Sequence, residues 1–229
     1  MTSDIILQAN HIEKYFYDPE KFKVLNDISF NIKKGEFATL IGKSGSGKST
    51  LLYILSTMDT DYQGEIIIDG TLVTGKNQNE LAAFRNEKIG FVFQFHYLLN
   101  EFSCLQNVMI PALRLGNYSK KDIEERAYQK LSLLGLQDQA LKPASKLSGG
   151  QQQRIAIARA LINDPVIIMG DEPTGNLDTK NSSIVFEIFR KLTQELNQTI
   201  IAVTHDNDFA DKSDRIIEME DGTIFNRII

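Results

Sequence analysis

A glycine-rich segment at residues 42–50 has the residue types of a loop that binds phosphate. It reads Gly-Lys-Ser-Gly-Ser-Gly-Lys-Ser-Thr and fits the pattern G-x-x-x-x-G-K-[ST]. Glycines let backbone N–H groups turn towards phosphate oxygens, and a following helix adds the positive end of its dipole. Lys48 would then reach the β- and γ-phosphates of a nucleotide, and the Ser49 hydroxyl would bind Mg²⁺. The candidate nucleotide ligands in this segment are Gly42, Ser44, Gly45, Ser46, Gly47, Lys48, Ser49 and Thr50.

Two adjacent carboxylates follow an apolar run later in the chain. Residues 166–169 are Val-Ile-Ile-Met, and Gly170, Asp171 and Glu172 come next. Because side chains alternate along a strand, we expect the two carboxylates to face different ways. One can hold the water shell of a metal while the other orients or deprotonates an attacking water. Ordinary surface charge is the alternative, and the phosphate-binding segment in the same chain weighs against it.

A second glycine-rich stretch, Leu-Ser-Gly-Gly-Gln at residues 147–151, precedes a helical pattern. Small residues at a helix N-terminus can bind an anion through free backbone N–H groups. The simpler interpretation is an ordinary serine cap of the helix. The spacing does not decide whether this stretch meets the phosphate-binding segment of its own chain.

The intervening elements predict an α/β fold. An apolar run at 37–41 predicts a buried strand that leads into the phosphate loop, and helical spacing follows it from residue 51. The remaining predicted strands are two in 5–32, interrupted at Asp18-Pro19, a pair around an Asp-Gly turn at 65–73, and single strands at 89–93, 166–169 and 199–204. Helical spacing covers about 98–161, with a helix at 120–134 between Ser119 and Gly135, and returns at 184–196.

Composition narrows the class of protein. The chain has 229 residues and a net charge of -5, without a dense cluster of lysine and arginine, so nucleic acid is not the expected partner. Cys104 is the only cysteine, which rules out an internal disulfide and favours a reducing compartment. Neither a signal peptide nor an apolar membrane span is visible. We therefore expect a cytoplasmic chain whose membrane role, if any, comes through a partner.

The order of these motifs resembles that of ATP-binding cassette (ABC) nucleotide-binding domains over essentially the whole chain. The segment 42–50 matches the Walker A loop, the strand ending at Asp171-Glu172 matches Walker B, and 147–151 matches the signature. Gln94 after the strand 89–93 matches the Q-loop, 175–178 the D-loop and His205 the switch histidine. Lys43 and Gly170 depart from the residues most frequent at their positions, but neither change removes a phosphate or metal ligand.

The resemblance implies a P-loop (RecA-like) mixed-sheet core with an N-terminal antiparallel β subdomain and an inserted α-helical subdomain. The whole of 1–229 would be one domain, with 1–94 and 163–229 in the core and 95–162 in the helical part. It implies ATP and Mg²⁺ as ligands and a head-to-tail dimer with two ATP molecules between the copies. Each site would combine the Walker A loop of one copy with Ser148, Gly149 and Gly150 of the other.

Individual roles also follow from the resemblance. Glu172 would be the catalytic base, His205 would hold the γ-phosphate, and Gln94 would sense the metal and the attacking water. Tyr15 is similar to the aromatic residue that stacks on adenine, with Phe16 and Tyr17 as alternatives, although each of the three can instead pack in a strand. The remaining implied contacts are Gln151 and Asp178 at the nucleotide, and Ser49, Gln94 and Asp171 at the metal.

The segment Phe-Gln-Phe-His-Tyr-Leu-Leu at 93–99 narrows the resemblance further. It is similar to the bacterial group that contains LolD-, MacB- and FtsE-type ATPases, and leans towards the lipoprotein-releasing LolD type. Such proteins bind integral membrane permease subunits on the inner face of the cytoplasmic membrane. Tyr97 and Phe102 would contact the permease, or would fill the core of the helical part. The alternatives are a MacB-like exporter, an FtsE-like division ATPase, and a nucleic-acid ATPase, which usually needs a coiled-coil insertion or a second cassette.

Overall fold

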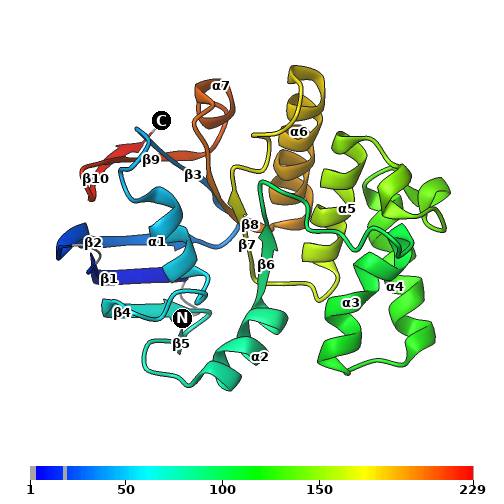
Figure 1. Cartoon of the computed structure of the whole chain (residues 1–229), viewed down its shortest axis with the longest axis horizontal. Helices are drawn as coiled ribbons and strands as arrows, with labels where there is room; N and C mark the ends of the chain where they lie inside the picture. Colours follow the sequence, from blue (N-terminus) through cyan, green and yellow to red (C-terminus); the bar gives the residue numbers. More distant parts are fainter. Residues whose placement is uncertain (1–3, 18–19, 229) are drawn as a thin grey trace.

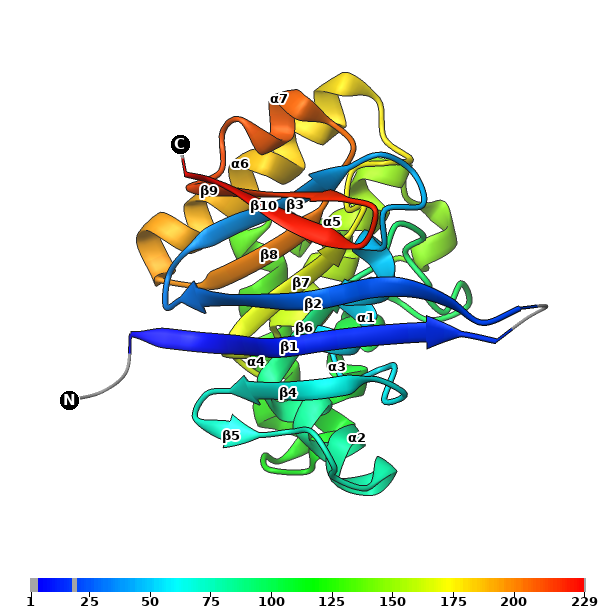
Figure 2. The same ribbon diagram turned by 90° about the vertical axis from the view of Figure 1, so that its left-hand side faces the viewer.

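The computed structural model of the chain describes residues 4–17 and 20–228. It contains a six-stranded sheet with an antiparallel sheet on one side and helices on the other (Figures 1 and 2). The predicted α/β class, with a mixed sheet, a separate antiparallel sheet and a helical region, is confirmed. The predicted connection at Asp18-Pro19 lies outside the described residues.

The central sheet places the ends of several strands at one edge. Its order is β10-β9-β3-β8-β7-β6, and all neighbours pair in parallel except β10 with β9. The strands are β3 (Phe37–Gly42), β6 (Ile89–Val92), β7 (Ile167–Asp171), β8 (Thr199–Val203), β9 (Arg215–Glu220) and β10 (Thr223–Ile228). Because parallel strands end at the same edge, the segments that follow β3, β7 and β8 come together there, as is usual for ligand sites in such sheets.

The antiparallel sheet has the order β2-β1-β4-β5. Its strands are β1 (Ile5–Phe16), β2 (Phe22–Lys33), β4 (Gln63–Ile68) and β5 (Thr71–Leu72). The turn between β4 and β5 is at Asp69 and Gly70, both with positive φ, as the Asp-Gly pair predicts. Strand β1 is irregular, with four shifts of register against β2. These bulges alter which of its residues share a face.

Seven α-helices are described: α1 (Lys48–Leu55), α2 (Gln78–Lys88), α3 (Cys104–Leu115), α4 (Lys120–Leu133), α5 (Gly149–Leu161), α6 (Thr179–Leu196) and α7 (Asn207–Ala210). Helix α4 begins after Ser119, whose hydroxyl accepts a hydrogen bond from the backbone N–H of Asp122, as predicted. Helix α6 begins five residues earlier than predicted because Asp178 caps it. Helix α2 was not predicted, although Asn77 and Glu80 form a capping box at its start.

The buried side chains form two clusters, one on each side of the central sheet. The first joins the antiparallel sheet and α1 to one face of the central strands, through Leu7, Leu40 and Leu52 among others. The second joins α3, α4, α5 and α6 to the other face, and includes Val108, Ile157, Phe189, Phe37 and Ile168. The helical region therefore shares its core with the central sheet. The domain boundaries at 94–95 and 162–163 stay a prediction.

Among the described residues, no helix has the length and apolar character that crossing a bilayer requires.

Candidate nucleotide-binding site

The glycine-rich segment forms a tight loop between β3 and α1, as predicted. Gly42 has a φ of 147° and Gly47 a φ of 98°, which favour glycine. A Cβ atom at Gly42 would lie 2.1 Å from the carbonyl oxygen of Met219 on β9. At Gly47 it would lie 2.8 Å from Cδ2 of Leu25. The loop is thus held close to two neighbouring strands, and glycine alone fits at both points.

Lys48 and Ser46 supply polar groups inside this loop. The Lys48 ammonium donates hydrogen bonds to the carbonyl oxygens of Gly42 and Lys43, both at 2.8 Å. Its side chain is buried, and burial lowers the pKa of Lys48 despite the nearby carboxylates of Asp171 and Glu172. The buried Ser46 hydroxyl has no hydrogen-bond partner among the described residues. Buried hydroxyls normally have a partner, so a phosphate oxygen fits this position.

Asp171 lies at the end of β7 and faces α1, where two hydroxyls hold its carboxylate. The Ser49 hydroxyl donates to Oδ1 at 3.0 Å, and the Tyr53 hydroxyl donates to Oδ2 at 2.8 Å. Burial, with the hydrogen bond to Asp171, raises the pKa of Tyr53 to about 12, so its hydroxyl keeps its proton at neutral pH. A serine hydroxyl beside a carboxylate is an oxygen set that suits Mg²⁺.

Glu172 follows the last residue of β7, and its surroundings differ from those of Asp171 because it lines the cavity at the phosphate loop. Its backbone has a φ of 49°, a left-handed conformation that is uncommon for a residue other than glycine. Its carboxylate forms an ion pair with Nδ1 of His205, which follows β8. The Glu172 side chain is mostly buried while that of His205 is exposed. The fold therefore brings the predicted base, Glu172, into contact with the predicted γ-phosphate ligand, His205, although the two are far apart in the sequence.

A cavity of about 510 Å³ joins these groups to the antiparallel sheet. One end is lined by Phe16, Phe22 and Val24. The other is lined by Gly42, Ser44, Gly45, Gly47, Lys48, Ser49, Thr50, Glu172 and His205. An apolar aromatic end and a phosphate-binding end are the surroundings that a nucleotide requires.

The prediction for Tyr15 needs a correction, because the cavity is lined by Phe16, one of the two alternatives. The Tyr15 hydroxyl donates to Glu13, and its ring lies beside the ammonium of Lys21. Tyr17, the other alternative, does not line the cavity either. The bulges in β1 place Phe16, and not Tyr15, on the side of the phosphate loop.

Gln94 lies beside Glu172, although it does not line the cavity. A Cβ atom at Gly175 would come within 3.0 Å of the Gln94 side-chain nitrogen and 3.4 Å of Glu172 Cβ. The Asn176 side chain donates a hydrogen bond to the Gln94 carbonyl oxygen at 3.1 Å. The predicted Q-loop and D-loop are therefore in contact next to the predicted base.

The signature stretch, at the start of α5, lies outside the cavity at the phosphate loop. Ser148 caps α5 in a capping box with Gln151, and a Cβ atom at Gly150 would clash with the side chain of Asn181, at 2.0 Å. Asp178 accepts hydrogen bonds from the same asparagine. None of Ser148, Gly149, Gly150, Gln151 and Asp178 lines the cavity at the phosphate loop. Within one chain, the structure does not bring the two glycine-rich stretches together.

A family model described as ABC transporter matches residues 25–175, which include the phosphate loop, the signature and both carboxylates. This chain belongs to the ABC transporter family. The predicted family and ATPase activity are confirmed. Two relatives named lipoprotein-releasing system ATP-binding protein LolD, from Aquifex aeolicus and Bacteroides thetaiotaomicron, are 46% and 50% identical to it. The first match covers 97% of both chains, and the second covers 88% of this chain and 92% of the relative.

Solved structures agree with this assignment. The dimeric structure of the bacterial ABC transporter cassette MJ0796 has a TM-score of 0.88 and is 37% identical, over 97% of this chain and 98% of that one. The same cassette, as a dimer in a post-hydrolysis state bound to ADP and Pi, matches equally well.

The sequence does not predict Phe22 and Val24 at the apolar end of the cavity, nor Tyr53 beside Asp171. Tyr53 lies four positions after Ser49 on α1, so the two side chains share a face of that helix. Both reach the same carboxylate. The i, i+4 spacing from the predicted metal ligand was the available signal.

Proposed function

We propose that this chain is the ATP-hydrolysing subunit of a transporter that releases lipoproteins from the cytoplasmic membrane. The observation that supports the chemistry is the single cavity shared by Lys48, Ser49, Glu172 and His205. Support for the cargo comes from the relatives named as lipoprotein-releasing, which match over nearly the whole chain.

In this proposal Phe16 stacks on the base, while the loop and Lys48 bind the phosphates. Ser49, Asp171 and Gln94 would hold Mg²⁺, and the metal, when bound, would supply positive charge that neutralises the phosphate oxygens. Glu172 orients or deprotonates the attacking water. His205, held by Glu172, binds the γ-phosphate.

We further propose that two copies form the complete site. Ser148, Gly149 and Gly150 do not face the phosphate loop of their own chain, so a second copy would supply them. The dimeric cassette MJ0796 supports this arrangement, because it has the same fold and is similar in sequence. ATP would then close the dimer, and hydrolysis with release of phosphate would reopen it.

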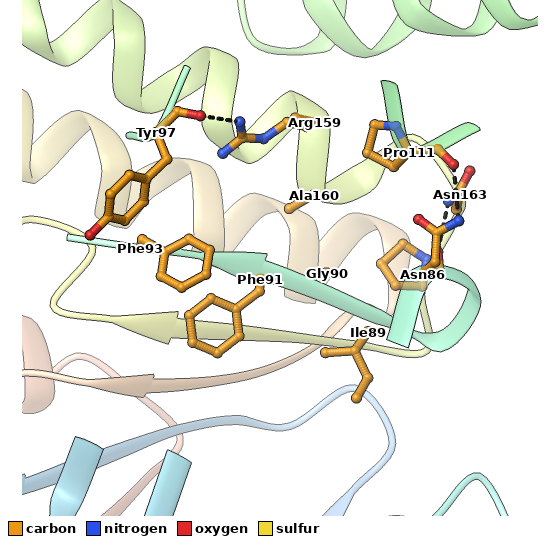
Figure 3. A pocket seen from close by; sticks show the side chains of 11 residues that line it. Asn86, Ile89, Gly90, Phe91, Phe93, Tyr97, Pro111, Arg159, Ala160 and Asn163 are labelled. Atoms are coloured by element: carbon orange, nitrogen blue, oxygen red, sulfur yellow. Dashed lines mark hydrogen bonds between the residues drawn. The ribbon is translucent and has the colours of Figure 1, made fainter. Parts of the chain in front are cut away.

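The permease would bind at a groove between β6 and the helical region (Figure 3). A cavity of about 280 Å³ there is lined by Phe91, Phe93, Tyr97, Pro111 and Arg159 among others. The exposed fraction of Tyr97 is 65% and that of Phe102 is 43%. Both side chains are thus available to a partner, and they do not fill the helical core. The chain would lie at the inner face of the cytoplasmic membrane through this contact.

Purification of the full chain from its native membrane, with identification of what accompanies it, tests the cargo. Two permease chains of the lipoprotein-releasing type are expected. A single multidomain exporter would support the MacB-like alternative, and a division protein the FtsE-like one; either result contradicts lipoprotein release. ATP hydrolysis by the purified chain, lost in the Glu172→Gln variant, tests the chemistry separately.

A further inference from the structure

Tyr53 holds the carboxylate on which the proposed metal site depends. Asp171 has two carboxylate oxygens, and each accepts one hydrogen bond from α1. Ser49 is the donor to Oδ1 and is itself a proposed metal ligand. Tyr53 is the donor to Oδ2, and its hydroxyl has no role in the proposed chemistry. Residues that orient a metal ligand in this way commonly change metal affinity when they are removed.

The Tyr53 ring is also the first in a row of four aromatic rings, each in contact with the next, and Phe95 packs against the last of them, Tyr97. Tyr53 and Phe91 have centroids 6.1 Å apart, Phe91 and Phe93 4.4 Å, and Phe93 and Tyr97 5.2 Å with the last two rings edge to face. Such distances are those of packed aromatic pairs. The last three residues of this aromatic row line the groove of Figure 3, with Tyr97 at its far end.

We propose that Tyr53 is a positioning residue that fixes Asp171 for Mg²⁺, and that the aromatic row transmits the state of the groove to Tyr53. Because β6 and the segment after it carry the three other rings, a partner that moves Tyr97 or Phe93 also moves the ring that packs against Tyr53. Occupation of the groove would then alter how firmly the Asp171 carboxylate is held. This inference rests on the proposed function, since it takes Asp171 as the metal-holding carboxylate.

The first experiment measures binding of a fluorescent, non-hydrolysable ATP analogue to the full chain during a titration with Mg²⁺. Tyr53→Phe removes one hydroxyl and keeps the ring. We expect it to raise the Mg²⁺ concentration at half-maximal binding about tenfold. Binding of the analogue in EDTA should change less than about twofold, because Tyr53 does not line the nucleotide cavity. An unchanged Mg²⁺ midpoint, or an equal loss of binding with and without metal, would overturn the positioning role.

Tyr62→Phe is the matched control. Its hydroxyl is likewise paired with a protein oxygen, Oγ1 of Thr74 at 2.8 Å, but it does not contact Asp171. Its Mg²⁺ midpoint should equal that of the unmodified chain. If both variants shift the midpoint equally, the effect comes from general loosening and the proposal is wrong.

The second experiment tests the aromatic row with Phe93→Leu, alone and combined with Tyr53→Phe. Alone, it should shift the Mg²⁺ midpoint by at least about twofold, and in the Tyr53→Phe background by much less. Equal shifts in both backgrounds, or none in either, would overturn the transmission through the aromatic row.

If the unmodified chain binds no analogue with or without Mg²⁺, the proposed function fails and the inference fails with it. If every variant binds the analogue with the Mg²⁺ midpoint of the unmodified chain, the inference is wrong while the proposed function stands.

Discussion

The two glycine-rich stretches differ in what their own chain supplies. The phosphate loop at 42–50 shares its cavity with side chains from β1, from β2 and from the segments after β7 and β8, so its surroundings are assembled from distant parts of the sequence. The signature at 147–151 is a locally capped helix start that packs against Asn181 and lines no part of that cavity. Under the proposed function, nucleotide binding would therefore be a property of one copy, whereas hydrolysis would require two.

The largest effect should come from Glu172→Gln. Loss of a general base lowers a rate by roughly 10²–10⁴-fold. Nucleotide binding should persist, so this variant should form a dimer in the presence of ATP and Mg²⁺. Phosphate release and size-exclusion chromatography measure the two properties. Hydrolysis at the unmodified rate would show that another residue is the base.

Lys48→Ala should act on binding by a single copy. A hydrogen bond to a charged group contributes about 1.5–3 kcal/mol, which corresponds to a loss of affinity of roughly 10–150-fold. Titration with fluorescent ATP at a concentration where the chain is monomeric measures it. Unchanged affinity would contradict the assignment of the phosphate loop.

Ser148→Ala should distinguish the role of the signature from that of the phosphate loop. Loss of the helix cap costs about 1 kcal/mol, or roughly 2–4 °C in the midpoint of thermal unfolding. Nucleotide affinity of the monomer should not change, while the ATP-dependent dimer should weaken. Calorimetry and sizing at several protein concentrations test this. Weaker nucleotide binding by the monomer would contradict the separation of the two stretches within one chain.

The smallest effect concerns Asp164, which joins α4 to the segment before β7 through ion pairs with Arg126 and Lys130. Burial alone would raise the pKa of the Asp164 carboxyl, but the hydrogen bonds and charges of Lys130 and Arg126 outweigh it and lower that pKa. The two ion pairs therefore stabilise the folded chain at any pH above the ordinary pKa of aspartate. This stabilisation is lost as the pH falls through the lowered pKa of Asp164.

Asp164→Asn should therefore reduce the free energy of unfolding at pH 7 by less than about 1 kcal/mol, because the pair is partly exposed. The difference between variant and unmodified chain should shrink as the pH falls below the range of ordinary aspartates. Denaturant unfolding at neutral and acidic pH measures it. A difference that does not depend on pH would show that the ion pairs are not its source.

The sequence predicts the phosphate loop, both carboxylates and much of the strand–helix order because each is encoded by a short segment. It does not predict β9, β10, α2 or α7. Nor does it predict that Phe16 and not Tyr15 lines the cavity at the phosphate loop, since bulges in β1 break the simple alternation. Tyr53 escaped prediction because its role arises from a contact between α1 and β7, 118 residues away. Helix α2 is mostly polar, so its apolar periodicity is weak, and its only local signal is the capping box.

The shared core of the helical region also bears on the exchange of parts between cassettes. Residues of α3, α4 and α5 pack together with Phe37, Ile168 and Phe189, which belong to the central sheet and to α6. A chimera that received 95–162 from another cassette would join one half of a packed interface to an unmatched half. Mismatched volumes leave cavities or overlaps that cost several kcal/mol when large side chains are involved. If this region carries the permease contact, as proposed, transplanting that specificity requires the opposing face of the sheet and of α6 to be transplanted too.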